Sequence, residues 1–86
     1  MSPQLSKLLS LLKSLEESIV EFERDPLVDE ASKVAEDVLI TETGANNWDA
    51  HEVLKQHGFE VFPGERDTFG WLIGCIQTKK GILCYG

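Results

Sequence analysis

Two histidines and two cysteines are the side chains of this chain best suited to bind a metal, but their spacing does not favour such a site. His51 and His57 stand six residues apart in a segment with helical periodicity, so they point in different directions, whereas helical metal pairs stand three or four apart. Cys75 and Cys84 lack the short paired spacing of a zinc knuckle. A composite site would need the helix and the terminal hairpin to converge. We therefore expect no metal site and no cofactor.

The two cysteines fall in two strands that are predicted to pair. A two-residue loop at 79–80 would place Cys75 opposite Cys84, close enough for a disulfide. A three-residue loop that ends at Gly81 would instead pair Cys84 with Ile76, and we favour this register. On this prediction both cysteines are reduced and serve as small apolar residues.

The sequence contains no convincing catalytic group. Asp49, His51 and Glu52 are neighbours, but the two acids stand at the start of a predicted helix, where the helix dipole explains them. No Ser or Cys lies in a glycine-flanked nucleophile elbow. Gly70 and Gly74 belong to a strand pattern and no helix follows them, so they do not form a phosphate loop. We expect no catalytic residues and no enzymatic activity.

Composition and charge are typical of one small globular domain with an acidic middle. The chain has 86 residues, of which 42% are hydrophobic, and its net charge is −7. Residues 25–57 carry eight acidic side chains against two basic ones, a local charge of −6. This charge disfavours direct nucleic-acid binding, which needs clustered Lys and Arg. A solvated acidic face is the simplest explanation. The alternative is a surface for a basic protein partner, formed by Asp29, Glu30, Glu36 and Asp37.

The start of the chain predicts one long amphipathic helix over residues 1–24. Apolar residues recur at spacings of three and four, and Ser2 followed by Pro3 is typical of a helix start. The side chains that need cover, and that we predict as an interface, are Leu5, Leu8, Leu9, Leu12, Leu15, Ile19 and Phe22. No segment matches a secretory signal or is apolar for long enough to cross a bilayer, so we expect a cytoplasmic protein without membrane association.

The rest of the chain, residues 25–86, predicts a small α+β body. Periodicity and turn residues predict helices over 26–43 and 48–57 and strands over 59–62, 69–78 and 82–85. The β-branched stretch 38–43 could be a short strand instead. Three N-terminal helices followed by a three-stranded antiparallel meander is the expected fold.

The predicted sheet carries apolar side chains on both faces. In its central strand Trp71, Ile73 and Cys75 face one way, while Leu72 and Ile76 face the other. A sheet with one solvated face normally alternates apolar and polar residues, so we expect both faces to be covered. The middle helices can cover one face, and the first helix or a second subunit would cover the other.

We therefore expect a small interaction protein that self-associates, most simply as a homodimer through its first helix, and that acts as an adaptor, a regulator or an accessory subunit. Leaving the leucine stripe in water would forgo about 10 kcal/mol of gross burial. A first helix that folds back on its own domain is the other arrangement that covers it. The alternative function is an acidic inhibitor or immunity-type protein that binds a basic protein surface. Trp48, Phe62 and Phe69 could form a binding edge, but we favour closure of the small core.

Overall fold

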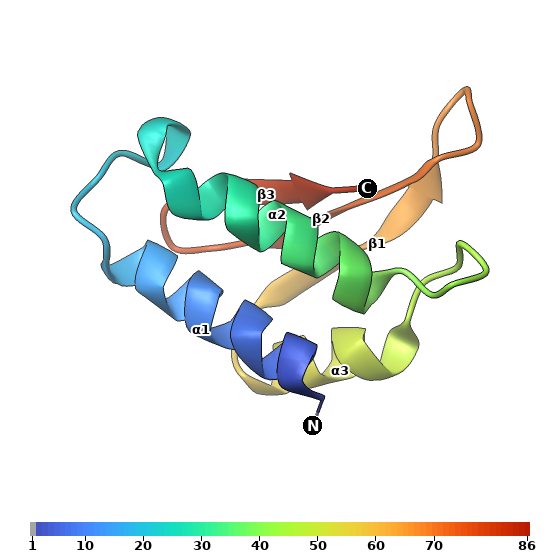
Figure 1. The fold of residues 1–86 in the computed structure, drawn as a ribbon, viewed down its shortest axis with the longest axis horizontal. Helices are drawn as coiled ribbons and strands as arrows, with labels where there is room; N and C mark the ends of the chain where they lie inside the picture. The colour runs from blue at the N-terminus through green and yellow to red at the C-terminus, as the bar shows by residue number, and fades with distance from the viewer. Residues whose placement is uncertain (1) are drawn as a thin grey trace.

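The structure, a computed structural model, describes residues 2–86 and contains three α-helices followed by three antiparallel β-strands (Figure 1). Along the chain the elements are α1 (Pro3–Glu17), the short 3₁₀ helix η1 (Phe22–Arg24), α2 (Pro26–Leu39), α3 (Trp48–Gln56), β1 (Glu60–Arg66), β2 (Leu72–Gln77) and β3 (Ile82–Tyr85). The strand order is β1-β2-β3. This confirms the predicted α+β class and its order of elements. Residue 1 of the predicted 1–24 segment lies outside the described residues.

The first helix begins where the sequence predicts and ends earlier. Ser2 caps it, since its Oγ accepts the Leu5 N–H at 3.1 Å. The helix ends at Glu17 rather than near residue 24. Ser18 leaves the helix with ψ at 142°, and its side-chain oxygen accepts the Val20 N–H at 3.1 Å. A serine side chain that bonds the backbone ahead of it competes with helix continuation.

A lysine from the β2–β3 turn anchors the chain that follows α1. Lys80 Nζ donates to the carbonyl oxygens of Ser18 and Val20, the latter at 2.8 Å. The ring of Phe22 packs against the same turn. Ile19 lies between these contacts and is fully exposed, at 100%. The contact joins residues 60 positions apart in sequence, so local periodicity does not reveal it.

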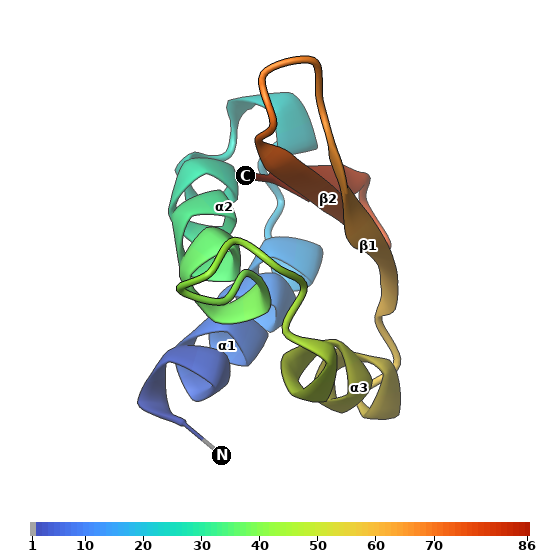
Figure 2. The same cartoon turned by 90° about the vertical axis from the view of Figure 1, so that its right-hand side faces the viewer.

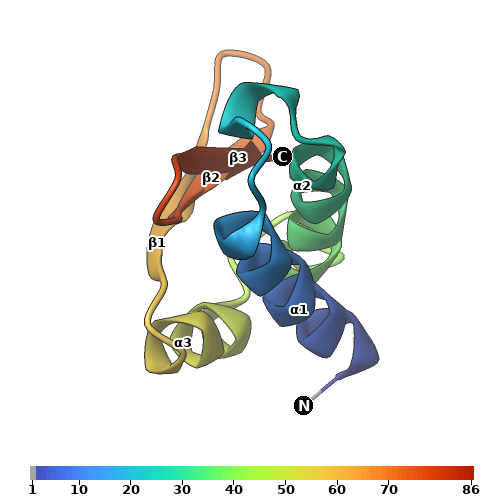
Figure 3. The same cartoon turned by 90° about the vertical axis from the view of Figure 1, so that its left-hand side faces the viewer.

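The helices cover one face of the sheet and leave the other without a helical layer (Figures 2 and 3). α1 packs against α2, α2 contacts β3, and α3 lies beside β1. The core between them consists of Leu5, Leu8, Leu9, Leu12, Ala31, Val34, Ala35, Val38, Leu39, Ala50, Leu54, Phe59, Val61, Ile76, Leu83 and Tyr85. Because α1 rests on α2, it does not reach across to the second face of the sheet.

The second and third helices begin as predicted. Asp25 caps α2 and Asn47 caps α3 through their side-chain oxygens. α2 ends at Leu39 rather than at residue 43, since the next residue pairs with Asn46 in an isolated antiparallel bridge. Gly44 makes the intervening turn with φ at +79°. α3 ends at Gln56, one residue before the predicted end.

The first strand begins one residue later than predicted and continues beyond the predicted end. It runs to Arg66 instead of ending at Phe62, and its register against β2 shifts between Phe62 and Glu65. Gly64, within this bulge, is held by Asn46: Asn46 Nδ2 donates to the Gly64 carbonyl at 3.1 Å, and Asn46 Oδ1 accepts the Gly64 N–H at 2.7 Å. The proline beside it is tolerated because β1 is an edge strand.

The central strand is shorter than the predicted 69–78 because a side chain closes the loop before it. β2 begins at Leu72. Asp67 Oδ1 accepts the N–H groups of Phe69 and Trp71, both at 2.9 Å, and thereby removes them from the strand. The last strand has the predicted bounds, 82–85.

Candidate functional site

The structure does not bring the histidines and cysteines together. His51 lies in the core at 2% exposure, and among residues 2–86 no group of three His, Cys, Asp or Glu side chains could hold a metal ion. Neither ring nitrogen of His51 has a hydrogen-bond partner within that range. Burial, and to a lesser extent the charge of Lys55, lower the pKa of His51 below 6.5, so its ring is neutral at neutral pH. His57 is exposed, with its Nδ1 2.9 Å from the Val53 carbonyl.

The short acidic cluster around His51 does not form an acid–base group. Asp49 and Glu52 are exposed, whereas the histidine between them is buried. Their carboxylates lie at the first and second turns of α3, on its solvent side. The arrangement is therefore that of an ordinary helix start.

The leucines of the first helix are covered within their own chain. Five of them are at most 7% exposed: Leu5, Leu8, Leu9, Leu12 and Leu15. The last two residues of the predicted interface, Ile19 and Phe22, lie beyond the helix end, and only Ile19 is fully exposed. The arrangement in which the helix folds back on its own domain accounts for the cover. A dimer contact through the α1 leucines loses its physical basis, since almost none of their surface remains for a second chain.

The outer sheet face is apolar and has no helix over it. We define it by Phe62 of β1, Ile73 and Cys75 of β2, and Ile82 and Cys84 of β3. Phe62 and Ile73 are each 43% exposed and Ile82 is 52% exposed. The register sets Phe62, Cys75 and Cys84 side by side across the three strands. The expectation that both faces are covered is therefore wrong for this chain by itself, because α1 packs on α2 instead.

The residues that we predicted as the interface all belong to residues 1–24 and do not include these side chains, although we expected that a second subunit could cover a sheet face. Strand alternation already separates Ile73 and Cys75 from Leu72 and Ile76, and the structure confirms this division. What alternation cannot give is the position of α1, which decides whether the second face receives cover.

Aromatic side chains outside the sheet are exposed as well. Phe69 is 83% exposed and Trp71 is 66% exposed, on the β1–β2 loop that projects at the right of Figure 1. Trp48, at the start of α3, is 61% exposed. The prediction that Trp48, Phe62 and Phe69 close the core is wrong. A binding edge formed by these side chains stays a prediction.

The two cysteines face each other on the outer sheet face. Cys75 pairs with Cys84 in the β2–β3 register, and their Sγ atoms are 2.7 Å apart as free thiols. The favoured three-residue loop is wrong, because Thr78 closes a two-residue turn. Its N–H donates to the Gly81 carbonyl at 2.8 Å, and its Oγ1 accepts the Gly81 N–H at 3.0 Å. Burial, then the hydrogen bond and charge of Cys84, raise the pKa of Cys75 to about 11.

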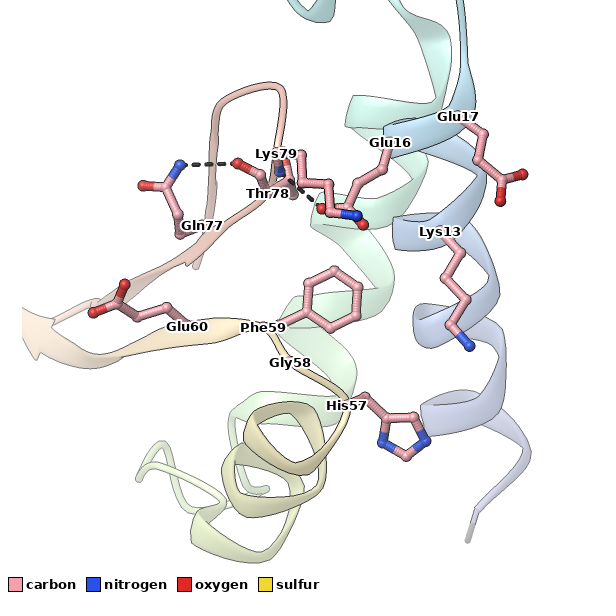
Figure 4. A pocket seen from close by; sticks show the side chains of 10 residues that line it. All are labelled: Lys13, Glu16, Glu17, His57, Gly58, Phe59, Glu60, Gln77, Thr78 and Lys79. Atoms are coloured by element: carbon pink, nitrogen blue, oxygen red, sulfur yellow. Dashed lines mark hydrogen bonds between the residues drawn. The ribbon is translucent and has the colours of Figure 1, made fainter.

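A cleft of about 800 Å³ lies between the second half of α1, the start of β1 and the end of β2 (Figure 4). Its lining carries charges of both signs, including Lys13 and Glu16. Glu16 Oε2 accepts the Lys79 backbone N–H at 2.8 Å, and Gln77 Nε2 donates to the Thr78 carbonyl at 2.9 Å. The first bond joins α1 to the β2–β3 turn, and the second lies within one wall of the cleft. The described lining residues include no buried unpaired polar atom, so the cleft has no feature that selects a class of ligand.

The predicted acidic surface lies on α2, in the helical layer. Its four carboxylates are all exposed: Asp29, Glu30, Glu36 and Asp37. Lys33 stands among them, and Lys7 of α1 approaches Glu30 at 3.7 Å. Within residues 2–86 no other member of the four makes an ion pair. The four carboxylates therefore form an exposed acidic surface on α2 that basic side chains neutralise only weakly.

No helix among residues 2–86 has the length and apolar character needed to cross a membrane. Comparison of the chain with protein-family models, with curated proteins and with solved structures finds no match.

Proposed function

We propose that this protein is a small non-enzymatic interaction domain that forms a homodimer through its outer sheet face and acts as an adaptor, a regulator or an accessory subunit. The observation that carries the proposal is the exposure of three large apolar side chains, at 43–52%, on a sheet face without helical cover. Apolar surface of this kind is stabilised by removal from water. The face differs from the predicted helix seam, while the expected mode of action stays the same.

The distribution of charge supports a second copy as the occupant. Glu60 and Glu65 flank the outer sheet face on the same side of the sheet, and both belong to β1, at one edge. A two-fold axis along β2 would stack β1 of one copy over β3 of its partner, so the glutamates of the two copies would lie at opposite edges of the interface and not against each other. Such a stack keeps the strands aligned, as sheet-on-sheet packing prefers. The chain has a net charge of −7, which opposes association. The acidic residues of α2 lie in the opposite layer, away from this interface, so they contribute little to that repulsion.

Light scattering coupled to size-exclusion chromatography tests the proposal. We expect twice the 9.6 kDa chain mass at high micromolar concentration and a monomer on dilution. Ile73→Lys puts a charge into the middle of the outer sheet face, and in the monomer this lysine can pair with Glu65, which stands opposite it. We expect this variant to be a folded monomer by circular dichroism. Ile19→Lys, the same charge change at a fully exposed position away from that face, should still dimerise.

Two outcomes would contradict the homodimer. One is a monomeric natural chain at all accessible concentrations. The other is an equal particle mass for the Ile73→Lys and Ile19→Lys variants. That result would mean that the added charge, and not its place on the sheet face, decides whether the chain dimerises.

We infer a second candidate function from the acidic surface of α2, namely binding of a basic protein. Its support is the exposure of Asp29, Glu30, Glu36 and Asp37. Within the described residues, Glu30 is the one member of the four that makes an ion pair, at 3.7 Å. Binding of poly-L-lysine, measured by anisotropy at increasing salt, is a direct probe, because surface electrostatics weaken with ionic strength. Changing these four residues to their amides should weaken binding more than the same change at Glu17, Glu21, Glu23 and Glu52. Equal losses in both variants would show that only net charge matters.

A further inference from the structure

The cysteine pair has the geometry of a cross-strand disulfide site. In a two-residue turn closed at Thr78 and Gly81, hydrogen-bonded and non-hydrogen-bonded pairs alternate along the strands. This alternation makes Cys75 and Cys84 a non-hydrogen-bonded pair, with a typical Cα separation of about 4.5 Å. That separation lies within the range of roughly 4.4–6.8 Å found for disulfides. The backbone therefore already holds the two residues in a position to bridge.

The side chains are also in place. The Sγ atoms lie 2.7 Å apart, and a disulfide bond of about 2.0 Å needs only a small further rotation of the side chains. Cys84 is exposed and Cys75 is half-buried beside it. The cysteine pair faces away from the core. The next pair in the register, Ile76 and Leu83, points to the helical layer and is at most 1% exposed, and adjacent pairs face opposite sides of a sheet. Bridging the sulfurs thus leaves the core packing unchanged.

We propose that Cys75 and Cys84 form a modification site, a reversible intramolecular disulfide made by exchange with small-molecule disulfides. The inference stands on the register and the two thiols and does not depend on the homodimer. Because the homodimer would cover this face, the exchange is a reaction of the monomer. A metal site at this place is disfavoured, because among residues 2–86 no third His, Cys, Asp or Glu side chain completes a ligand group.

The exchange proceeds in two balanced steps. Cys84, the more exposed thiol, loses its proton to solvent and attacks one sulfur of the small disulfide, which releases one small thiolate and leaves a mixed disulfide on Cys84. Cys75 then loses its proton and attacks Cys84 Sγ, so the bond to the second small thiol breaks. The two protein thiols give up two electrons and two protons in total. The small disulfide takes them up and leaves as two thiols.

The assignment of the two roles follows from the environment of each sulfur. Because its raised pKa of about 11 keeps Cys75 protonated at neutral pH, it is the poorer first nucleophile. Its position against Cys84 makes it an efficient second nucleophile, since the strand pairing holds the two residues directly opposite each other.

Titration with oxidised and reduced glutathione tests the proposal. The reaction is run at low micromolar protein, quenched with a maleimide and read by intact mass. We expect the natural chain to lose two hydrogen atoms and both maleimide-reactive thiols together, without a covalent dimer, and dithiothreitol should restore both. Cys75→Ser should instead stop at the mixed disulfide, with one glutathione bound to Cys84. Cys84→Ser should react more slowly than Cys75→Ser.

Three results would overturn the inference: glutathione adducts on the natural chain without ring closure, retention of both thiols at a large excess of oxidised glutathione, or a disulfide between chains. The main readout needs no variant, so a folding defect in a serine variant would not obscure it. Repeating the titration on Ile73→Lys, which is expected to be monomeric, separates the two proposals. A loss of ring closure in that monomer would contradict the disulfide, whereas a monomeric natural chain that still closes the ring would contradict only the dimer.

Discussion

Replacing Leu12 by alanine, with Ile19→Ala as its control, tests which part of the leucine-rich segment is core. Both residues belong to the apolar repeat that predicts one continuous seam, and both substitutions remove three carbon atoms. The structure separates them completely. Leu12 is 0% exposed beneath α2, while Ile19 is 100% exposed beyond the end of α1.

The expected magnitude follows from burial. Three carbons at about 0.8 kcal/mol each give roughly 2.4 kcal/mol of lost transfer free energy for Leu12→Ala. The cavity left behind raises the destabilisation to about 3–5 kcal/mol. Ile19→Ala should change stability by no more than about 0.5 kcal/mol. At about 0.05–0.15 kcal/mol per residue, the free energy of unfolding of the 86-residue chain is roughly 4–13 kcal/mol, so Leu12→Ala removes a large share of it.

Urea unfolding followed by far-ultraviolet circular dichroism measures the difference. For an m-value near about 1.5 kcal/mol/M, the midpoint of Leu12→Ala should fall by roughly 2–3 M relative to the natural chain. Leu12→Val leaves a smaller cavity and supplies a second point if the alanine variant is unfolded without denaturant. Equal midpoints for Leu12→Ala and Ile19→Ala, or a larger loss at Ile19, would refute the assignment of the seam to the chain's own core.

Three further predictions concern single side chains. Asn46→Ala leaves the Gly64 N–H and carbonyl in the β1 bulge without their partner, so we expect thermal melts to show a loss of about 1–3 kcal/mol, with Asn46→Asp in between. The backbone N–H at the start of α2 lowers the pKa of Asp25 below 3.8. Its folded-state pKa is thus below its unfolded one, so its contribution is present above pH 3.8 and lost as the pH falls through the folded value. Asp25→Asn should flatten that part of a plot of urea midpoint against pH. Gly74→Ala would bring a Cβ to 2.6 Å from the ring of Tyr85, and chemical unfolding should show a loss of about 1–3 kcal/mol.

Local chemistry accounts for the parts of the fold that could be predicted. Helices were expected to begin after Ser2 and at residue 26, and the side chains of Ser2 and Asp25 each accept a backbone N–H there. The change from helical to strand periodicity between residues 57 and 59 correctly separated the helices from the strands. Alternation in β2 and β3 correctly sorted Ile73 from Ile76. Each of these features depends on residues within a few positions of one another.

The candidate site was harder to predict because it is defined by what remains uncovered. The end of α1 depends on Ser18 and on Lys80, which lies 60 or more positions away. The pairing of Cys75 with Cys84 depends on whether Thr78 closes a two-residue turn, and the sequence allowed two registers. In each case one contact decides between two local structures that the sequence alone allows.

The sequence by itself determined the order of the elements, the helix starts and the two faces of the central strand. Tertiary structure decided which apolar stripe became core and which stayed exposed. The physical reason is that the hydrophobic effect is non-directional. An amphipathic pattern indicates which surface favours burial. Packing among distant segments decides which segment covers that surface. Here the leucines of α1 pack against α2, and the outer sheet face with its cysteine pair stays exposed.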